Sequence, residues 1–136
     1  MTVSKSTKIL SLGQTEVDVL VSSRDLAVEA ARAAYDKKAV DVRILDMRDT
    51  LGITDYFVIC SGANERQVRR IQEHIEEKMK EKGVYPARRE GVRFARWILL
   101  DFMDFVVHIF REEERLYYDL EHLWQDVERV DWQESA

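Results

Sequence analysis

The chain has 136 residues, of which 46% are hydrophobic and 35% are charged, and its formal net charge is −5 at pH 7. These values predict one folded domain and exclude a disordered chain, and the acidic balance favours a protein partner over wholesale nucleic-acid binding. No apolar run approaches the roughly 18 residues that a membrane-spanning helix needs. The single cysteine, Cys60, excludes an internal disulfide and a Cys-x-x-Cys zinc site, and it is typical of a cytoplasmic protein.

The N-terminal part predicts a loose segment followed by a helix. Residues 1–21 are predicted to be a mobile N-terminal extension without a secretory signal, although Val17–Val21 has the composition of a short strand. The folded domain is predicted to span residues 22–124 and to begin with a helix that Ser22 caps. Its buried face is expected to contain Leu26, Ala30, Ala33 and Ala34.

Two strands and a second helix follow. Residues 42–47 and 56–60 are predicted strands, and the second is apolar throughout, so we expect it to be central and buried on both faces. A short loop over 61–63 leads to a helix that Asn64 caps and Gly83 ends. The residues that recur at helical spacing and predict its buried stripe are Val68, Ile71, Ile75 and Met79.

The stretch from Trp97 to Phe110 predicts an antiparallel hairpin, which a short edge strand over 85–89 and a loop over 90–96 precede. If Met103 and Asp104 form a two-residue turn, six apolar residues share one face of this hairpin. The pairs on that face are then Phe102 with Phe105, Leu100 with Val107, and Ile98 with Ile109. Two-residue turns need a positive φ that suits methionine poorly, so a longer or bulged turn is the alternative.

The opposite face of the hairpin, which we call the mixed face, is the candidate functional surface. Its cross-strand pairs are Trp97 with Phe110, Leu99 with His108, and Asp101 with Val106. The face is aromatic at one end and polar at the other. We therefore expect it either to bind a partner or to be covered by a helix or a second protomer.

The C-terminal part predicts a helix and a tail. Glu112–Glu114 suits a helix N-terminus because acidic side chains stabilise that end. The helix is expected to pack on the sheet, and residues 125–136 are predicted to be a polar C-terminal tail. The residues expected to make the helix contacts are Leu116, Leu120, Leu123 and Trp124. The chain therefore predicts an α/β fold with a mixed sheet of about five strands and helices.

Sites for small ligands are weakly indicated. The loop Ser61–Asn64 precedes a helix N-terminus, where backbone N–H groups can hold a phosphate, but it has one glycine and no Walker lysine. The aspartates and histidines lack the spacing of two-metal or zinc sites, so turn, cap and structural roles are favoured. His108 is a candidate general base or, more simply, a structural or interface histidine, and Cys60 is expected to be inert.

A cluster of arginines precedes the hairpin. Glu90 is the acidic residue among Arg88, Arg89, Arg93 and Arg96. This local positive balance is expected either to contact RNA phosphate or to form a solvated loop with local ion pairs.

These residues together resemble the ribosomal silencing factor family, also called the RsfS or Iojap family. The match runs in order from Ser22 to Trp124. Its blocks are Asp41–Asp46, Thr54–Gly62, Arg66–Val68, Glu90–Gly91, Trp97–Asp101, Val106–Phe110, Arg115, Tyr118–Glu121 and Leu123–Trp124. Two positions depart from the family pattern, which has glycine at the place of Met103 and Thr-Ser at the place of Ala63–Asn64.

The resemblance implies a nucleotidyltransferase-like topology, a homodimer when the protein is free, and a function without catalytic residues, cofactor or metal. It implies binding to the large ribosomal subunit through ribosomal protein uL-fourteen, with a minor rRNA contact, which blocks joining to the small subunit and slows translation under nutrient limitation. The family position that matches Trp97 lies in the contact region. The predicted partner-binding residues are Trp97, Leu99, His108, Phe110, Glu90, Gly91 and Arg93.

The alternative is a degenerate nucleotidyltransferase-like protein that binds a nucleotide at the loop of Gly62. The chain lacks the Gly-Ser pair and the alternating acidic residues that this chemistry needs, and a fold does not supply a function without its site.

Overall fold

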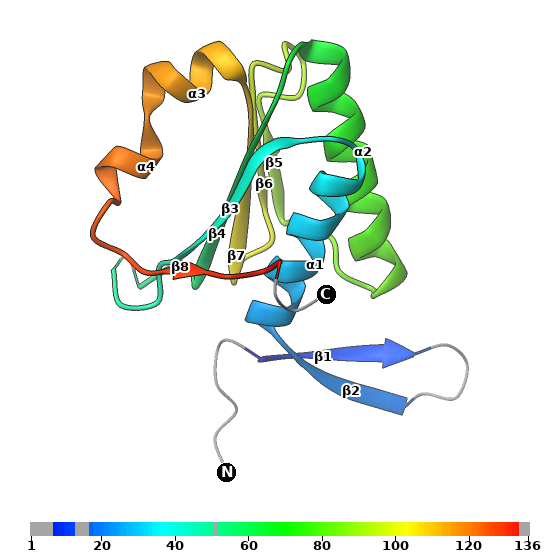
Figure 1. The fold of residues 1–136 in the computed structure, drawn as a ribbon. Coiled ribbons are helices and arrows are strands. Elements are labelled where there is room, and N and C mark those ends of the chain that lie inside the picture. Colours follow the sequence, from blue (N-terminus) through cyan, green and yellow to red (C-terminus); the bar gives the residue numbers. More distant parts are fainter. Residues whose placement is uncertain (1–6, 13–16, 51, 134–136) are drawn as a thin grey trace.

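A six-stranded mixed sheet lies at the centre of the computed structural model, which describes residues 7–12, 17–50 and 52–133 (Figure 1). The strand order is β5 (Arg88–Glu90), β6 (Trp97–Asp101), β7 (Phe105–Arg111), β4 (Tyr56–Gly62), β3 (Val40–Asp46) and β8 (Arg129–Val130). The neighbours β4 and β7 are parallel, and the other neighbouring pairs are antiparallel. The α/β prediction is confirmed, and the sheet has one strand more than expected because β8 joins its edge.

Helices cover both faces of this sheet. Figure 1 shows α1 (Ser23–Asp36) and α2 (Glu65–Glu81) together on one face, and α3 (Glu112–Tyr118) and α4 (Leu120–Leu123) on the other. None of the helices in the described part of the chain is long and apolar enough to cross a membrane.

The described part of the N-terminal extension forms a separate two-stranded antiparallel sheet of β1 (Thr7–Leu12) and β2 (Val17–Ser22). The strand predicted over Val17–Val21 is therefore confirmed. The whole of residues 1–21 was expected to be a mobile extension, and residues 1–6 and 13–16 of it lie outside the described residues.

The caps predicted for the two long helices are present. The Ser22 hydroxyl accepts a hydrogen bond from the Asp25 N–H at 3.1 Å, and the Asn64 amide oxygen accepts one from the Gln67 N–H at 2.9 Å. Gly83 has a φ of +73° and follows the end of α2. Local side-chain chemistry thus sets these helix boundaries, as expected for capping.

The larger core lies between the sheet and the helices α1 and α2. The predicted stripe of α2 is completely buried there, together with the alanine-rich face of α1. The six apolar residues of the hairpin are also buried in this core. They are Ile98, Leu100, Phe102, Phe105, Val107 and Ile109. The prediction of one purely apolar hairpin face is confirmed.

The hairpin turn has two residues, as counted from the sequence. The Phe102 N–H donates to the Phe105 carbonyl at 3.0 Å, and Trp97 pairs with Phe110 at the far end of the ladder. Met103 adopts a φ of +75°, and its N–H donates to the Asp101 carboxylate at 2.8 Å. The alternative prediction of a longer or bulged turn is therefore wrong. The side-chain hydrogen bond to Asp101 stabilises the tight turn despite the unfavourable backbone conformation of Met103.

Three other expected boundaries are corrected. Strand β3 begins at Val40 rather than at 42, and the predicted loop over 61–63 is shorter because Ser61 and Gly62 continue β4. The edge strand is Arg88–Glu90 rather than 85–89. In each case the pairing with a neighbouring strand decides which residues are extended.

The prediction of a continuous C-terminal helix with a buried apolar stripe is wrong. Asp119 adopts a left-handed conformation with a φ of +47° and separates α3 from α4. Leu116, before the break, and Leu123, after it, are 81% and 66% exposed. Leu120 and Trp124 pack on the smaller core of the sheet's other face. A break of this kind rotates the later residues, so a single helical period no longer describes the segment.

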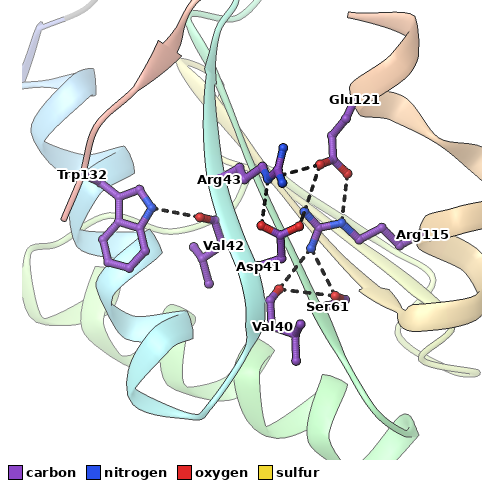
Figure 2. Close-up of polar contacts among 8 residues, drawn as sticks. All are labelled: Val40, Asp41, Val42, Arg43, Ser61, Arg115, Glu121 and Trp132. Atoms are coloured by element: carbon purple, nitrogen blue, oxygen red, sulfur yellow. Dashed lines mark hydrogen bonds and ion pairs between the residues drawn. The ribbon is translucent and has the colours of Figure 1, made fainter. Parts of the chain in front are cut away.

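The buried residue of α3 is Arg115, which attaches α3 and α4 to the sheet (Figure 2). Its guanidinium donates to the Val40 carbonyl at 3.0 Å and to the Ser61 hydroxyl at 3.1 Å. It also forms two bonds to the Glu121 carboxylate at 2.9 and 3.2 Å, and lies 3.6 Å from the Asp41 carboxylate. Such a multiply bonded arginine fixes both position and orientation.

The predicted polar tail is also corrected, because part of it belongs to the domain. Strand β8 pairs with β3, and Trp132 is buried against α1, where its ring lies edge-on to Tyr35. The Trp132 indole N–H donates to the Val42 carbonyl at 3.0 Å (Figure 2). Residues 134–136 lie outside the described residues.

Candidate functional site

The mixed face of β6 and β7 is covered at its aromatic end and open at its polar end. Phe110 is buried and stacks on Trp97 with ring centroids 4.8 Å apart. Tyr118 of α3 lies over Trp97, with a centroid distance of 4.7 Å. Toward the turn, Leu99 and Val106 remain partly exposed. The expectation of a covering helix is therefore met at one end of this face. The other end is accessible, and binding of a partner there stays a prediction.

A hydrogen bond from Trp97 determines which ring nitrogen of His108 carries the proton. The indole N–H of Trp97 donates to Nδ1 of His108 at 3.1 Å, so Nδ1 is an acceptor and carries no proton. Burial lowers the pKa of His108 to about 3, which keeps the ring neutral at physiological pH. A neutral imidazole whose Nδ1 is unprotonated carries its proton on Nε2. Nε2 of His108 is thus a hydrogen-bond donor.

Lowering the pH from 7 to 5 is expected to reduce the free energy of unfolding by about 2 kcal/mol through His108 alone. The unfolded chain binds a proton near the ordinary pKa of 6.5, whereas the folded chain does so only near 3. The contribution of neutral His108 to the free energy of unfolding is therefore complete above pH 6.5, and it is lost as the pH falls toward 3. Urea unfolding at both pH values measures this difference.

The control for this pH effect is His108→Gln, whose amide oxygen can still accept from the Trp97 N–H. This variant should lose most of the stability difference between pH 7 and pH 5. An unchanged difference in the variant would show that another group causes the pH dependence.

A groove of about 340 Å³ lies at the open end of the mixed face. Phe57, Leu99 and Val106 supply apolar walls, and His108 lines it between them. The Phe57 and His108 rings meet edge to face with centroids 4.6 Å apart. The other residues that line the groove are Ile53, Thr54, Arg88, Asp101 and Met103. An apolar groove with a few polar groups is the usual form of a recognition site.

The sequence did not point to Thr54 or Phe57 as members of this site. They reach it because β4 pairs in parallel with β7, which places Phe57 beside Val106 and Ile59 beside His108. Alternation along β4 indicates that Phe57 and Ile59 share a face, but it does not identify the strand that lies next to them.

The predicted partner-binding residues are distributed over surface and interior. Glu90 and Arg93 are exposed, and Trp97 and Leu99 are partly exposed. His108 and Phe110 are buried, at 4% and 1% exposure. The partner-binding role of these residues stays a prediction, in which the buried pair supports the exposed residues.

Gly91 lies directly against the backbone of β6. It has a φ of +76°, and a Cβ at this position would overlap the carbonyl oxygen of Trp97. The Gly91 carbonyl accepts from the Ala95 N–H at 3.0 Å, which closes the loop before the strand. Gly91 therefore acts on the mixed face by placing Trp97.

The loop considered as a phosphate site is already capped. The Gln67 side-chain oxygen accepts from the Ala63 N–H at 2.7 Å, while Asn64 accepts from the Gln67 N–H. These bonds resemble a capping box, with the Ala63 N–H in place of that of the cap residue, and they use two of the backbone N–H groups at this end of the helix. An ordinary strand-to-helix turn is the better interpretation of this loop.

The other candidates from the sequence are metal ligands, the thiol of Cys60 and the arginine cluster. No group of three or more histidine, cysteine or acidic side chains could hold a metal in the part of the chain that the structure describes. Burial raises the pKa of the Cys60 thiol to about 12, which fits the expected inert role. Arg89 pairs with Glu76 and Arg88 lies near Asp101, so part of the arginine cluster is locally neutralised.

Comparison with known proteins identifies relatives over most of the chain. Residues 21–136 match the family described as ribosomal silencing factor during starvation. The ribosomal silencing factor RsfS of Bacillus subtilis is 43% identical over 102 residues, which cover 75% of this chain and 86% of that protein. The RsfS of Halalkalibacterium halodurans is 41% identical over 111 residues, covering 82% and 95%.

A crystal structure from Bacillus halodurans shares the fold with a TM-score of 0.71 and 40% sequence identity. It covers 79% of this chain and 98% of its own. The resemblance inferred from the sequence is thus confirmed. The chain belongs to the ribosomal silencing factor family.

Proposed function

We propose that this protein is a non-enzymatic translation repressor that binds the large ribosomal subunit through ribosomal protein uL-fourteen. Binding there blocks association with the small subunit and slows translation in the cytoplasm under nutrient limitation. The names of the relatives support the ribosomal role. The observation that carries the docking surface is the mixed face itself, on which Trp97, Leu99 and Val106 are partly exposed apolar side chains. Leu99 and Val106 line the groove at the open end, and Trp97 lies toward the end that α3 covers.

The charge distribution around these side chains supports a basic partner. The segment from Arg111 to Ala136 contains nine acidic and three basic residues. In this segment, α3 begins with Glu112–Glu114 and contacts the mixed face through Tyr118. Acidic groups around an apolar surface attract a basic surface and orient its approach, while aromatic anchors supply most of the binding energy.

Two further parts of the proposal concern the edge of the surface and the free protein. Arg93 is exposed, and its guanidinium lies 5.4 Å from the ring of Phe94. We assign a minor rRNA contact to this loop, because an exposed guanidinium can bind a phosphate. In the free protein, the partly exposed apolar side chains of the mixed face favour a homodimer.

The test compares two adjacent leucines on opposite faces of β6. Leu99→Ala is expected to weaken co-sedimentation with purified large subunits about tenfold, with little change in melting temperature. Leu100→Ala should instead cost about 2–5 kcal/mol of folding stability, while the folded fraction still binds. Equal binding by the wild type and the Leu99 variant would contradict the proposed surface. Failure of the wild type to bind large subunits would reject the proposed function.

Trp97→Ala is expected to affect both measurements. The substitution removes an exposed aromatic surface, but it also leaves Nδ1 of buried His108 without its donor. Trp97→Phe keeps the stacking area and loses the N–H, so it separates the two effects.

A further inference from the structure

The groove contains two buried polar groups for which the described residues supply no hydrogen-bond partner. They are Nε2 of His108 and the hydroxyl of Thr54, and both residues line the same cavity of about 340 Å³. Buried polar atoms are nearly always bonded, and an unpaired one lowers stability by about 1–3 kcal/mol. Two of them at one groove indicate a surface completed by something outside the chain.

The chemistry of the missing partner follows from the donor at His108. Nδ1 already accepts from Trp97, so Nε2 offers an N–H and needs an acceptor. A lysine or arginine cannot supply one, because its charged group only donates. A carboxylate would have to lose its hydration between the apolar walls of Phe57, Leu99 and Val106. An uncharged oxygen on an apolar stem satisfies both conditions.

The route to these atoms passes side chains that can move. Ile53 and Met103 line the groove and are 79% and 61% exposed. Met103 is unbranched and occupies a left-handed conformation with a φ of +75° at the hairpin turn. Displacement of an exposed methionine needs little rearrangement of packed structure.

We propose that the groove binds a partner side chain or loop with an apolar stem and an uncharged amide or hydroxyl oxygen, which accepts a hydrogen bond from Nε2 of His108. The inference rests on the proposed function, because the groove lies on the mixed face, where Leu99 and Val106 line it. It adds that the basic partner contributes a neutral contact at this position. The partner's cations then lie outside the groove, toward the acidic segment.

The first test uses Thr54→Val, which removes a hydroxyl while nearly keeping the side-chain volume. Because the described residues give this hydroxyl no partner, the variant should melt at the wild-type temperature or above it. Its affinity for large ribosomal subunits should fall roughly three- to tenfold. The matched control is Thr50→Val, the same change at an exposed threonine that does not line the groove.

If the wild-type protein binds large subunits and Thr54→Val binds them with the same affinity, the proposed role of the groove is wrong. The proposed function would then still stand. Loss of affinity in both threonine variants would also overturn it, because the effect would not be specific to the groove.

The second test does not depend on the ribosome. N-acetyl-leucine methylamide carries a branched apolar stem and neutral amide oxygens, whereas isopentylammonium carries a similar stem and a cation. In spectra of the ¹⁵N-labelled protein, the amide should shift the Nε2–H resonance of His108 and the cation should not. The Thr54→Val variant should show a smaller shift. No shift with the amide, or equal shifts with both probes, would overturn the inference even if large-subunit binding is confirmed.

Discussion

Gly91→Ala is expected to destabilise the fold by about 4 kcal/mol or more, because it combines backbone strain with a steric overlap that has no flexible partner. The added Cβ would overlap the carbonyl oxygen of Trp97 and lie 3.0 Å from its carbonyl carbon. Both atoms belong to the backbone of β6, so relief requires a shift of the strand itself. Guanidinium unfolding followed by tryptophan fluorescence measures the loss.

Gly83→Ala is the matched control for this prediction. Gly83 has a φ of +73°, close to the +76° of Gly91, but a Cβ at position 83 has no atom within 4 Å. Its alanine variant should therefore lose only the conformational part, about 1 kcal/mol. Equal losses in the two variants would show that the overlap at β6 is absorbed without cost. The same displacement should weaken large-subunit binding by the folded Gly91 variant, since Trp97 begins the mixed face.

Arg115→Met is expected to lower the free energy of unfolding by about 3–5 kcal/mol, since it removes one partner of a buried charge pair. The Arg115 side chain is only 10% exposed, and Glu121 at 17% exposure would lose both guanidinium bonds. The Val40 carbonyl and the Ser61 hydroxyl would also lose a donor (Figure 2). Thermal and denaturant unfolding should both report the change.

Arg43→Met provides the comparison for Arg115. Arg43 bonds Asp41 at 2.8 Å and lies 3.5 Å from Glu121, but its side chain is 31% exposed. Hydrogen bonding to Arg43 holds the pKa of the Asp41 carboxyl below its usual range. Water can replace a partly exposed guanidinium, so this variant should lose about 1 kcal/mol or less.

The double variant Arg115→Met with Glu121→Gln tests the cause of the loss. It should recover part of the stability, because it also removes the partly buried Glu121 carboxylate, which Arg115→Met leaves with Arg43 alone, at 3.5 Å. A double variant as unstable as Arg115→Met alone would show that Glu121 is not the source of the cost.

The effect of Arg115 should extend to the mixed face. Arg115 fixes α3 and α4 to β3 and β4, and α3 carries Tyr118 over the indole of Trp97. Folded Arg115→Met should therefore bind large subunits more weakly, although Arg115 itself does not line the groove. This places Arg115 among the residues that position the surface.

The sequence alone determined the features that depend on neighbouring residues. The two helix caps are bonds between residues three positions apart, and the hairpin register follows from a two-residue turn and strict alternation. The prediction of an apolar face on β6 and β7 was correct for this reason. The length of the turn did not follow from the sequence, because local preference disfavours a methionine at positive φ. In the structure, the Asp101 carboxylate stabilises that conformation by accepting from the Met103 N–H.

Only the tertiary structure decided what lies against the mixed face. Whether Trp97 is core or surface depends on α3, whose position is set by the bonds from Arg115 to a strand far away in the sequence. The groove exists because the parallel pairing of β4 with β7 brings Thr54 and Phe57 to His108. Leu116 is exposed while Leu120, four residues later, packs on the sheet, because the left-handed Asp119 lies between them and interrupts the helical period. Periodicity reports which residues share a face, but the burial of that face depends on contacts between distant segments.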